Sequence, residues 1–277
     1  MNINKSNHYT FWGEDNSTVV DEFLGTTEVK KGKDLIQLAS YRRAISNFVN
    51  IVTGENIPVE FNSRDQSFTD GKKVTIGANL NEKTFDVAVG LALHEGSHIK
   101  LSDFKFLNGL DTAIPSSVYS LGALKNLSRS EVYSLVKNIM NYVEDRRIDS
   151  YIFRTSPGYK GYYHAMYDKY FYNRNIDKGL LSIEYRKEDI DSYLFRIINI
   201  HNKNRQLKAL KGLHEIWDIL DLVDIHKLDS KKVFDRSITI AEIVLNNIDK
   251  VEVESDPDKN SNGNEEKIEG GDATVGD

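Results

Sequence analysis

The chain of 277 residues contains no cysteine. This absence excludes disulfides, thiolate metal ligands and a cysteine nucleophile, so any bound metal must be held by nitrogen and oxygen ligands. The sequence also lacks a run of about 18 apolar residues that would span a bilayer, and its opening residues, MNINKSNHYTFWGED, lack the apolar segment of a secretory signal. We therefore expect a cytoplasmic protein that does not bind a membrane.

The body of the chain has little excess of either charge. The formal net charge is −6, but residues 252–277 hold nine acidic side chains and two lysines, which leaves 34 basic and 33 acidic residues elsewhere, a net of about +1. A nearly neutral body has no field suited to a phosphate backbone, so we expect no nucleic-acid binding. The acidic end is rich in glycine and asparagine and predicts a disordered tail or linker at 251–277, after one domain at 1–250.

Apolar residues recur mostly at helical spacing. This periodicity predicts helices at 34–52, 85–101, 128–153, 190–202, 207–222 and 231–248. Ser128 and Glu131 form a predicted capping box for the third of these helices. Short β-rich segments predict strands at 58–61 and 74–77 and, more weakly, at 17–23. The fold class that follows is α+β, mostly α, with a small β-sheet.

The second predicted helix carries the pattern HExxH, formed by His94, Glu95 and His98. The two histidines lie one helical turn apart, so both imidazoles can bind one ion. Glu95 lies about 100° around the helix from His94, where it can contact a water on the metal rather than the metal itself, and we expect it to act as the catalytic base. The alternative is that both histidines are hydrogen-bonded within the core. The apolar run FDVAVGLAL before them favours a metal site, because buried polar groups need partners.

A third metal ligand must come from elsewhere in the chain. The longer pattern HExxHxxGxxH fails, because Leu101 and Phe104 stand where glycine and a third histidine are needed. Asp103 is expected to support the site indirectly or to cap a helix. We predict Glu144 as the third ligand, because it lies beside an apolar stripe of the helix at 128–153 and completes a His, His, Glu set for zinc.

Other acidic residues on the same helix have predicted supporting roles. Asp145 points about 100° away from Glu144, and either Asp145 or Asp149 is expected to orient a ligating histidine through its second nitrogen. The alternative for Glu144 itself is an ion pair with Arg147 or Arg146.

An aromatic segment follows this helix closely. Tyr159, Tyr163 and His164 are candidates to stabilise an oxyanion, although an aromatic core cluster explains the segment as well. The remaining histidines lack paired ligand spacing, so no role is assigned to them. They are His8, His201, His214 and His226.

Three segments, HEGSHIKLSDF, NYVEDRRID and SPGYKGYYHAMYDKYF, resemble the metallopeptidase-like amino-terminal domain of cobaltochelatase T-subunit-like proteins that carry a von Willebrand A domain. Such proteins occur in bacteria and large phages. The resemblance implies a gluzincin, zincin-like fold with His94, His98 and Glu144 as zinc ligands and Glu95 as base. It also implies a possible MoxR-like AAA+ ATPase as partner, and residues 251–277 resemble the acidic linker that precedes the von Willebrand A domain in that group.

Two functions of different classes follow from these patterns. The first is zinc-dependent hydrolysis of peptide bonds in a peptide or protein substrate by a metal-bound water, with an extended peptide pairing with the strand at 74–77. The second is a non-proteolytic adaptor or chelatase-like subunit, in which zinc is structural and the chain works with the ATPase. The composition suits an AT-rich genome such as that of a phage, which places the protein in the host cytoplasm.

Overall fold

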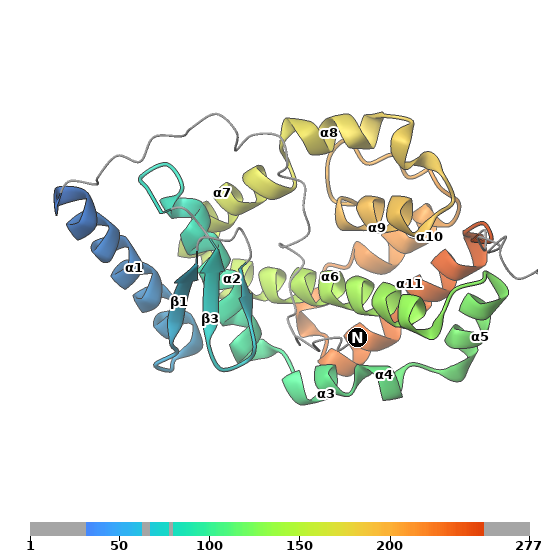
Figure 1. Cartoon of the computed structure of the whole chain (residues 1–277), viewed down its shortest axis with the longest axis horizontal. Helices are drawn as coiled ribbons and strands as arrows, with labels where there is room; N and C mark the ends of the chain where they lie inside the picture. The colour runs from blue at the N-terminus through green and yellow to red at the C-terminus, as the bar shows by residue number, and fades with distance from the viewer. Residues whose placement is uncertain (1–31, 63–66, 78–79, 252–277) are drawn as a thin grey trace, which may run out of the picture.

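A computed structural model describes residues 32–62, 67–77 and 80–251. The described chain is mostly helical with one small sheet (Figure 1). The elements, in chain order, are α1 (Gly32–Thr53), β1 (Val59–Asn62), β2 (Phe68–Thr69), β3 (Val74–Gly77), α2 (Phe85–Leu101), α3 (Phe104–Asn108), α4 (Leu110–Ala113), α5 (Ser116–Leu124), α6 (Arg129–Thr155), α7 (Lys160–Tyr170), α8 (Arg174–Leu181), α9 (Ile190–Ile198), α10 (Leu213–Leu220) and α11 (Ser230–Asn247). Short 3-10 helices lie at Pro157–Tyr159, Glu184–Arg186 and Ile225–Lys227.

The long helix α6 lies between two hydrophobic cores (Figure 1). One core is built from α1, α2, α7 and the sheet, with the carboxyl end of α6. The other is built from helices α4, α5 and α9 to α11, packed on the amino-terminal and middle part of α6. The polar residues of interest lie where α2 contacts α6, between the two cores.

The sheet has the strand order β1-β3-β2. Strand β3 pairs with β1 in parallel and with β2 in antiparallel, and all four of its residues are buried. Both edges of β3 are therefore already paired. Among the described residues, β1 pairs with all four residues of β3 and β2 pairs with Val74 and Thr75, so an extended peptide cannot pair with the whole strand at 74–77 as expected.

Helix α2 packs closely against its neighbours because two glycines leave room. A Cβ atom built on Gly90 would lie 2.5 Å from the backbone oxygen of Tyr162 in α7, and one built on Gly96 would lie 2.9 Å from Val52 in α1. The glycine inside HExxH thus lets α1 lie directly against the histidine-bearing helix. Eleven consecutive residues of α2, 88–98, are buried as a result.

The predicted elements are mostly confirmed. The helix at 85–101 is observed with the same bounds, α1 and α6 match within a few residues, and Ser128 and Glu131 form the capping box. Helices α9 and α10 are shorter than predicted. Strand β2 was not predicted, and neither were the helices α3, α4, α5, α7 and α8. The weak strand predicted at 17–23 and the predicted tail lie outside the described residues, apart from residue 251.

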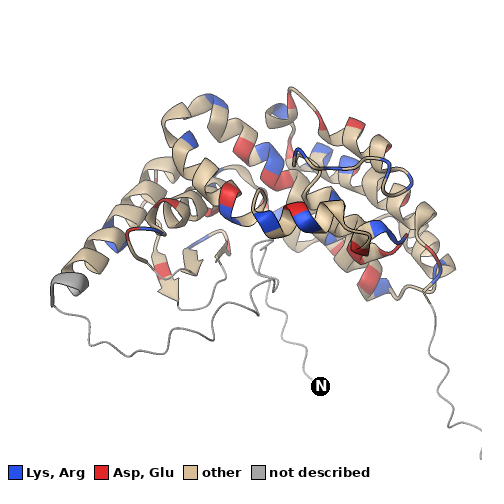
Figure 2. Ribbon diagram, turned by 90° about the horizontal axis from the view of Figure 1, so that it is seen from above, with Lys and Arg blue, Asp and Glu red and all other residues tan. Residues whose placement is uncertain are grey.

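Charges of both signs are interspersed along the helices in the view of Figure 2. This pattern agrees with the near-neutral sum over the body of the chain. Among the described helices, none is both long enough and apolar enough to cross a membrane.

Candidate metal centre

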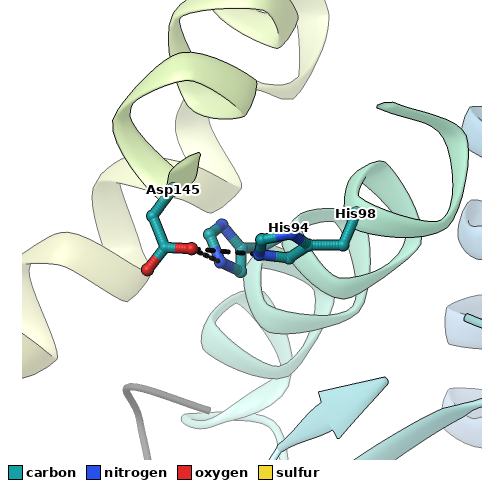
Figure 3. Close-up of side chains that lie close together, drawn as sticks. All are labelled: His94, His98 and Asp145. Carbon is teal, nitrogen blue, oxygen red and sulfur yellow. Dashed lines mark hydrogen bonds and ion pairs between the residues drawn. The ribbon is translucent and has the colours of Figure 1, made fainter. Parts of the chain in front are cut away.

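The two histidines of the HExxH pattern point from α2 toward α6. His94 and Glu95 are each 1% exposed and His98 is 9% exposed, so the pattern lies in the interior. Their spacing of one helical turn brings the two rings close together, with centroids 4.9 Å apart. Asp145 of α6 reaches the same point from the other side (Figure 3).

One oxygen of Asp145 lies between the two imidazoles. Its Oδ1 atom is 3.0 Å from Nε2 of His98 and 3.5 Å from Nε2 of His94. Ligand atoms held 2.0–2.1 Å from a tetrahedral zinc ion lie about 3.3–3.4 Å apart, so these separations fit a shared ion with small adjustments. Within the described chain, His94, His98 and Asp145 form the group whose candidate ligand atoms all lie within 4.8 Å of one another.

The other ring nitrogen of each histidine has a polar partner. Nδ1 of His94 is 2.9 Å from Oδ1 of Asp149, and the hydroxyl of Tyr167 donates to the other oxygen of that carboxylate. Nδ1 of His98 is 3.0 Å from the hydroxyl of Ser102. Partners on Nδ1 fix the ring orientation and leave Nε2 of both histidines directed at Asp145, which is the usual support for ligating histidines.

Glu144, the predicted third ligand, is not grouped with the two histidines in the described chain, and its carboxylate has other partners. Arg147 donates to both of its oxygens, at 2.8 Å from Nε and 2.6 Å from Nη2. Ser102 also donates to Glu144, at 2.6 Å. The ion pair that sequence analysis gave as the alternative is therefore present, and Asp145 stands where Glu144 was expected. Asp149 takes the orienting role that was undecided between the two aspartates.

Glu95 supplies the carboxylate of the HExxH pattern. Its Oε2 atom is buried and has no hydrogen-bond partner among the described residues. Burial raises the pKa of Glu95 to about 7, and the nearby histidines only partly offset this effect. A carboxylate with such a pKa is suited to accept and return a proton near neutral pH.

The charges of the three clustered groups depend on one another. Burial disfavours a charged His94, but Asp149 and Asp145 outweigh burial and raise the pKa of this imidazole well above its usual value. Burial also disfavours a charged Asp145, but hydrogen bonds from His94 and His98 lower the pKa of this carboxyl to about 2.

The other predicted site residues lie apart from the three clustered groups. Asp103 caps α3 by accepting a hydrogen bond from the backbone of Phe106, which is the capping role considered for it. Tyr159 is partly buried and packs edge-on against Phe48, and His164 is exposed and stacks with Phe153.

Tyr163 is the oxyanion candidate with a polar contact to the HExxH helix among the described residues. It is fully buried, and its hydroxyl lies 3.5 Å from the hydroxyl of Ser97. Burial, with Asp149 nearby, raises the pKa of Tyr163 well above its usual value, so the phenol keeps its proton.

Ser102 and Tyr167 contact the site from positions that were not predicted from the sequence. Ser102 lies four residues after His98, immediately beyond the helix end, and this spacing is a usable signal. Tyr167 lies 18 residues after Asp149, and only the fold of α7 against α2 and α6 brings it there.

No family model, curated protein or solved structure matches the chain. The likeness to cobaltochelatase T-subunit-like proteins therefore stays an expectation, and so do the gluzincin-type fold and its partners.

Proposed function

We propose that this protein is a zinc-dependent, metallopeptidase-like hydrolase of zincin-like fold, in which His94, His98 and Asp145 hold the metal. The observation that carries the proposal is the convergence of both Nε2 atoms on one oxygen of Asp145, while both Nδ1 atoms have other partners. Two imidazoles and one carboxylate form a ligand set that leaves a fourth position for water or substrate.

The side chains around this centre divide the chemical work. A zinc ion held there would supply Lewis acidity to a water and to a peptide carbonyl. Glu95 accepts a proton from the attacking water through its free oxygen and returns it to the leaving amine. Asp149 and Ser102 keep the two imidazoles in place throughout, so the geometry does not have to reorganise during the reaction.

The structure also contains an observation that favours a second function. The side chains of His94 and Asp149 are 1% exposed, and those of His98 and Asp145 are 11% and 10% exposed. A metal enclosed to this degree suits a structural role in an adaptor that works with an ATPase of the MoxR type. The hydrolase is preferred because a structural zinc site uses four protein ligands, whereas three converge in the described part of the chain.

The deciding experiment compares two neighbouring carboxylates. Metal content is measured by elemental analysis in the wild type, Asp145→Asn and Glu144→Gln. These are matched changes of a carboxylate to an amide, one residue apart on α6. We expect about one zinc per chain in the wild type and in Glu144→Gln, and its loss in Asp145→Asn, because only Asp145 faces both histidines.

A casein-digestion assay then tests catalysis. Glu95→Gln is expected to keep zinc and to lose cleavage by about 100-fold or more, as expected for a missing general base. Zinc in the wild type without any cleavage supports the adaptor. Absence of zinc from the wild type refutes the metal centre itself, and loss of zinc from Glu144→Gln but not from Asp145→Asn refutes the assignment of the third ligand.

A further inference from the structure

A pocket opens beside the candidate metal centre, on the side of α6 that carries Tyr142, Asp145 and Arg146. It is small and partly open to solvent. Residues from α7, the turn after it and α9 close its other sides, among them Tyr167 and Tyr172. Asp145 is thus shared between the pocket and the three-residue cluster.

Arg146 places a positive charge in this pocket without a counter-ion of its own. Its Nε atom is buried and has no hydrogen-bond partner, and no carboxylate lies within ion-pair distance of its guanidinium among the described residues. Both oxygens of Asp149 are already bound to His94 and Tyr167. A partly buried guanidinium without a paired anion costs free energy, and an anionic ligand would reduce that cost.

A second buried group in the pocket lacks a partner. Asn199 is 4% exposed, and its Oδ1 atom makes no hydrogen bond to the described chain, while its amide nitrogen donates to the backbone of Phe195. An acceptor beside an unpaired guanidinium suits a ligand that presents a carboxylate and an N–H group together. His201 also lines the pocket, and its Nδ1 atom is hydrogen-bonded to the hydroxyl of Tyr142. Burial lowers the pKa of His201 to about 3, so this imidazole stays neutral and adds no positive charge to the pocket.

We propose that this pocket is a carboxylate-binding subsite for the peptide substrate, with Arg146 binding the carboxylate and Asn199 accepting from the peptide N–H. The inference deepens the proposed function, because it names the group that is recognised next to the metal. The carboxylate has two possible sources, the free carboxyl end of a peptide or an acidic side chain, and both present the same chemistry to Arg146.

Binding of small probes to the full chain tests the subsite without any need for catalysis. The probes are two matched pairs, N-acetylalanine with its amide and N-acetylglutamate α-amide with N-acetylglutamine α-amide. Isothermal titration is performed on the protein as purified and after chelator treatment, which separates the pocket from a metal that also binds carboxylates. Preference within the first pair identifies a peptide carboxyl end, and preference within the second identifies an acidic side chain.

We expect at least one acid to bind about 10- to 100-fold more tightly than its amide, the range for a buried charge-assisted hydrogen bond. Arg146→Gln is expected to abolish this preference, and Arg174→Gln, a change of an exposed arginine on α8, to leave it intact. If Arg146→Gln does not fold, Arg146→Lys keeps the charge but loses the bidentate geometry, and about a 10-fold weaker acid binding is expected.

Equal binding of acid and amide in both pairs would overturn the subsite, as would unchanged acid preference in a folded Arg146 variant. Failure of the metallopeptidase proposal gives a different result, namely missing zinc or missing cleavage with the acid preference intact after chelation.

Discussion

Asp149→Asn tests whether the support behind the histidines sets metal affinity. The carboxylate of Asp149 is 2.9 Å from Nδ1 of His94, both side chains are 1% exposed, and Tyr167 donates to its other oxygen. The amide variant has nearly the same shape but loses the negative charge that holds the ring and makes it a stronger ligand. Removal of such a partner typically weakens metal binding by about 10- to 100-fold.

The expected loss of zinc affinity can also be measured as a loss of protein stability. At a free zinc concentration of 100 times the wild-type Kd, zinc adds about 2.7 kcal/mol to the free energy of unfolding of the wild type. A Kd raised 10- to 100-fold reduces this gain to about 1.4 to 0.4 kcal/mol at the same concentration. Urea titrations with and without zinc measure the gain, and a competitive chelator assay measures Kd directly.

Matched variants on α7 give the controls. Tyr167→Phe removes the hydroxyl that donates to Asp149 and leaves the carboxylate in place, so a smaller loss, about a few-fold in Kd, is expected. Asp168→Asn changes the exposed neighbour and should leave Kd unchanged. A wild-type Kd in Asp149→Asn would show that the hydrogen bond to His94 does not support a metal ligand, and the argument for the centre would fail with it.

Three further outcomes concern stability. Glu144→Gln leaves the buried Arg147 without its carboxylate, and we expect a loss of about 3 kcal/mol in urea unfolding of the metal-free protein; a loss under about 1 kcal/mol contradicts this. Between pH 6.5 and 4.5, protonation of His201 in the unfolded chain should lower the free energy of unfolding of the wild type by about 2 to 3 kcal/mol, and His201→Gln should not show this loss. Burial and two nearby arginines lower the His201 pKa to about 3, so below about pH 6.5 only the unfolded chain binds that proton, and equal pH profiles would refute the shift. Gly90→Ala should cost about 1 to 3 kcal/mol, since the new Cβ would lie 2.5 Å from a backbone oxygen of α7, whereas Gly161→Ala meets nothing within 4 Å and should be neutral or slightly stabilising in thermal unfolding.

Local features of the sequence determined much of the fold. Apolar residues three and four apart specified α1, α2 and α6, and a serine and a glutamate three residues apart specified where α6 begins. Pairing of the two histidines was equally local, because one helical turn separates them whatever surrounds the helix. The missed helices α7 and α8 have mixed polar and aromatic sequences, and contacts with the rest of the fold decide their conformation.

Tertiary structure alone decided the third member of the cluster. Glu144 and Asp145 are adjacent on α6 and differ by about 100° in direction, so the choice depends on how α6 is rotated against α2. The apolar stripe could not settle that rotation, because α6 is buried on most of its circumference between two cores and has no single inward face. The rotation of α6 against α2 places Asp145 beside the histidines and Glu144 beside Arg147. The packing of α7 and α9 places an unpaired Arg146 at a pocket beside them. Sequence by itself determined which residues were available for this chemistry, and the packing of the helices decided which of them meet.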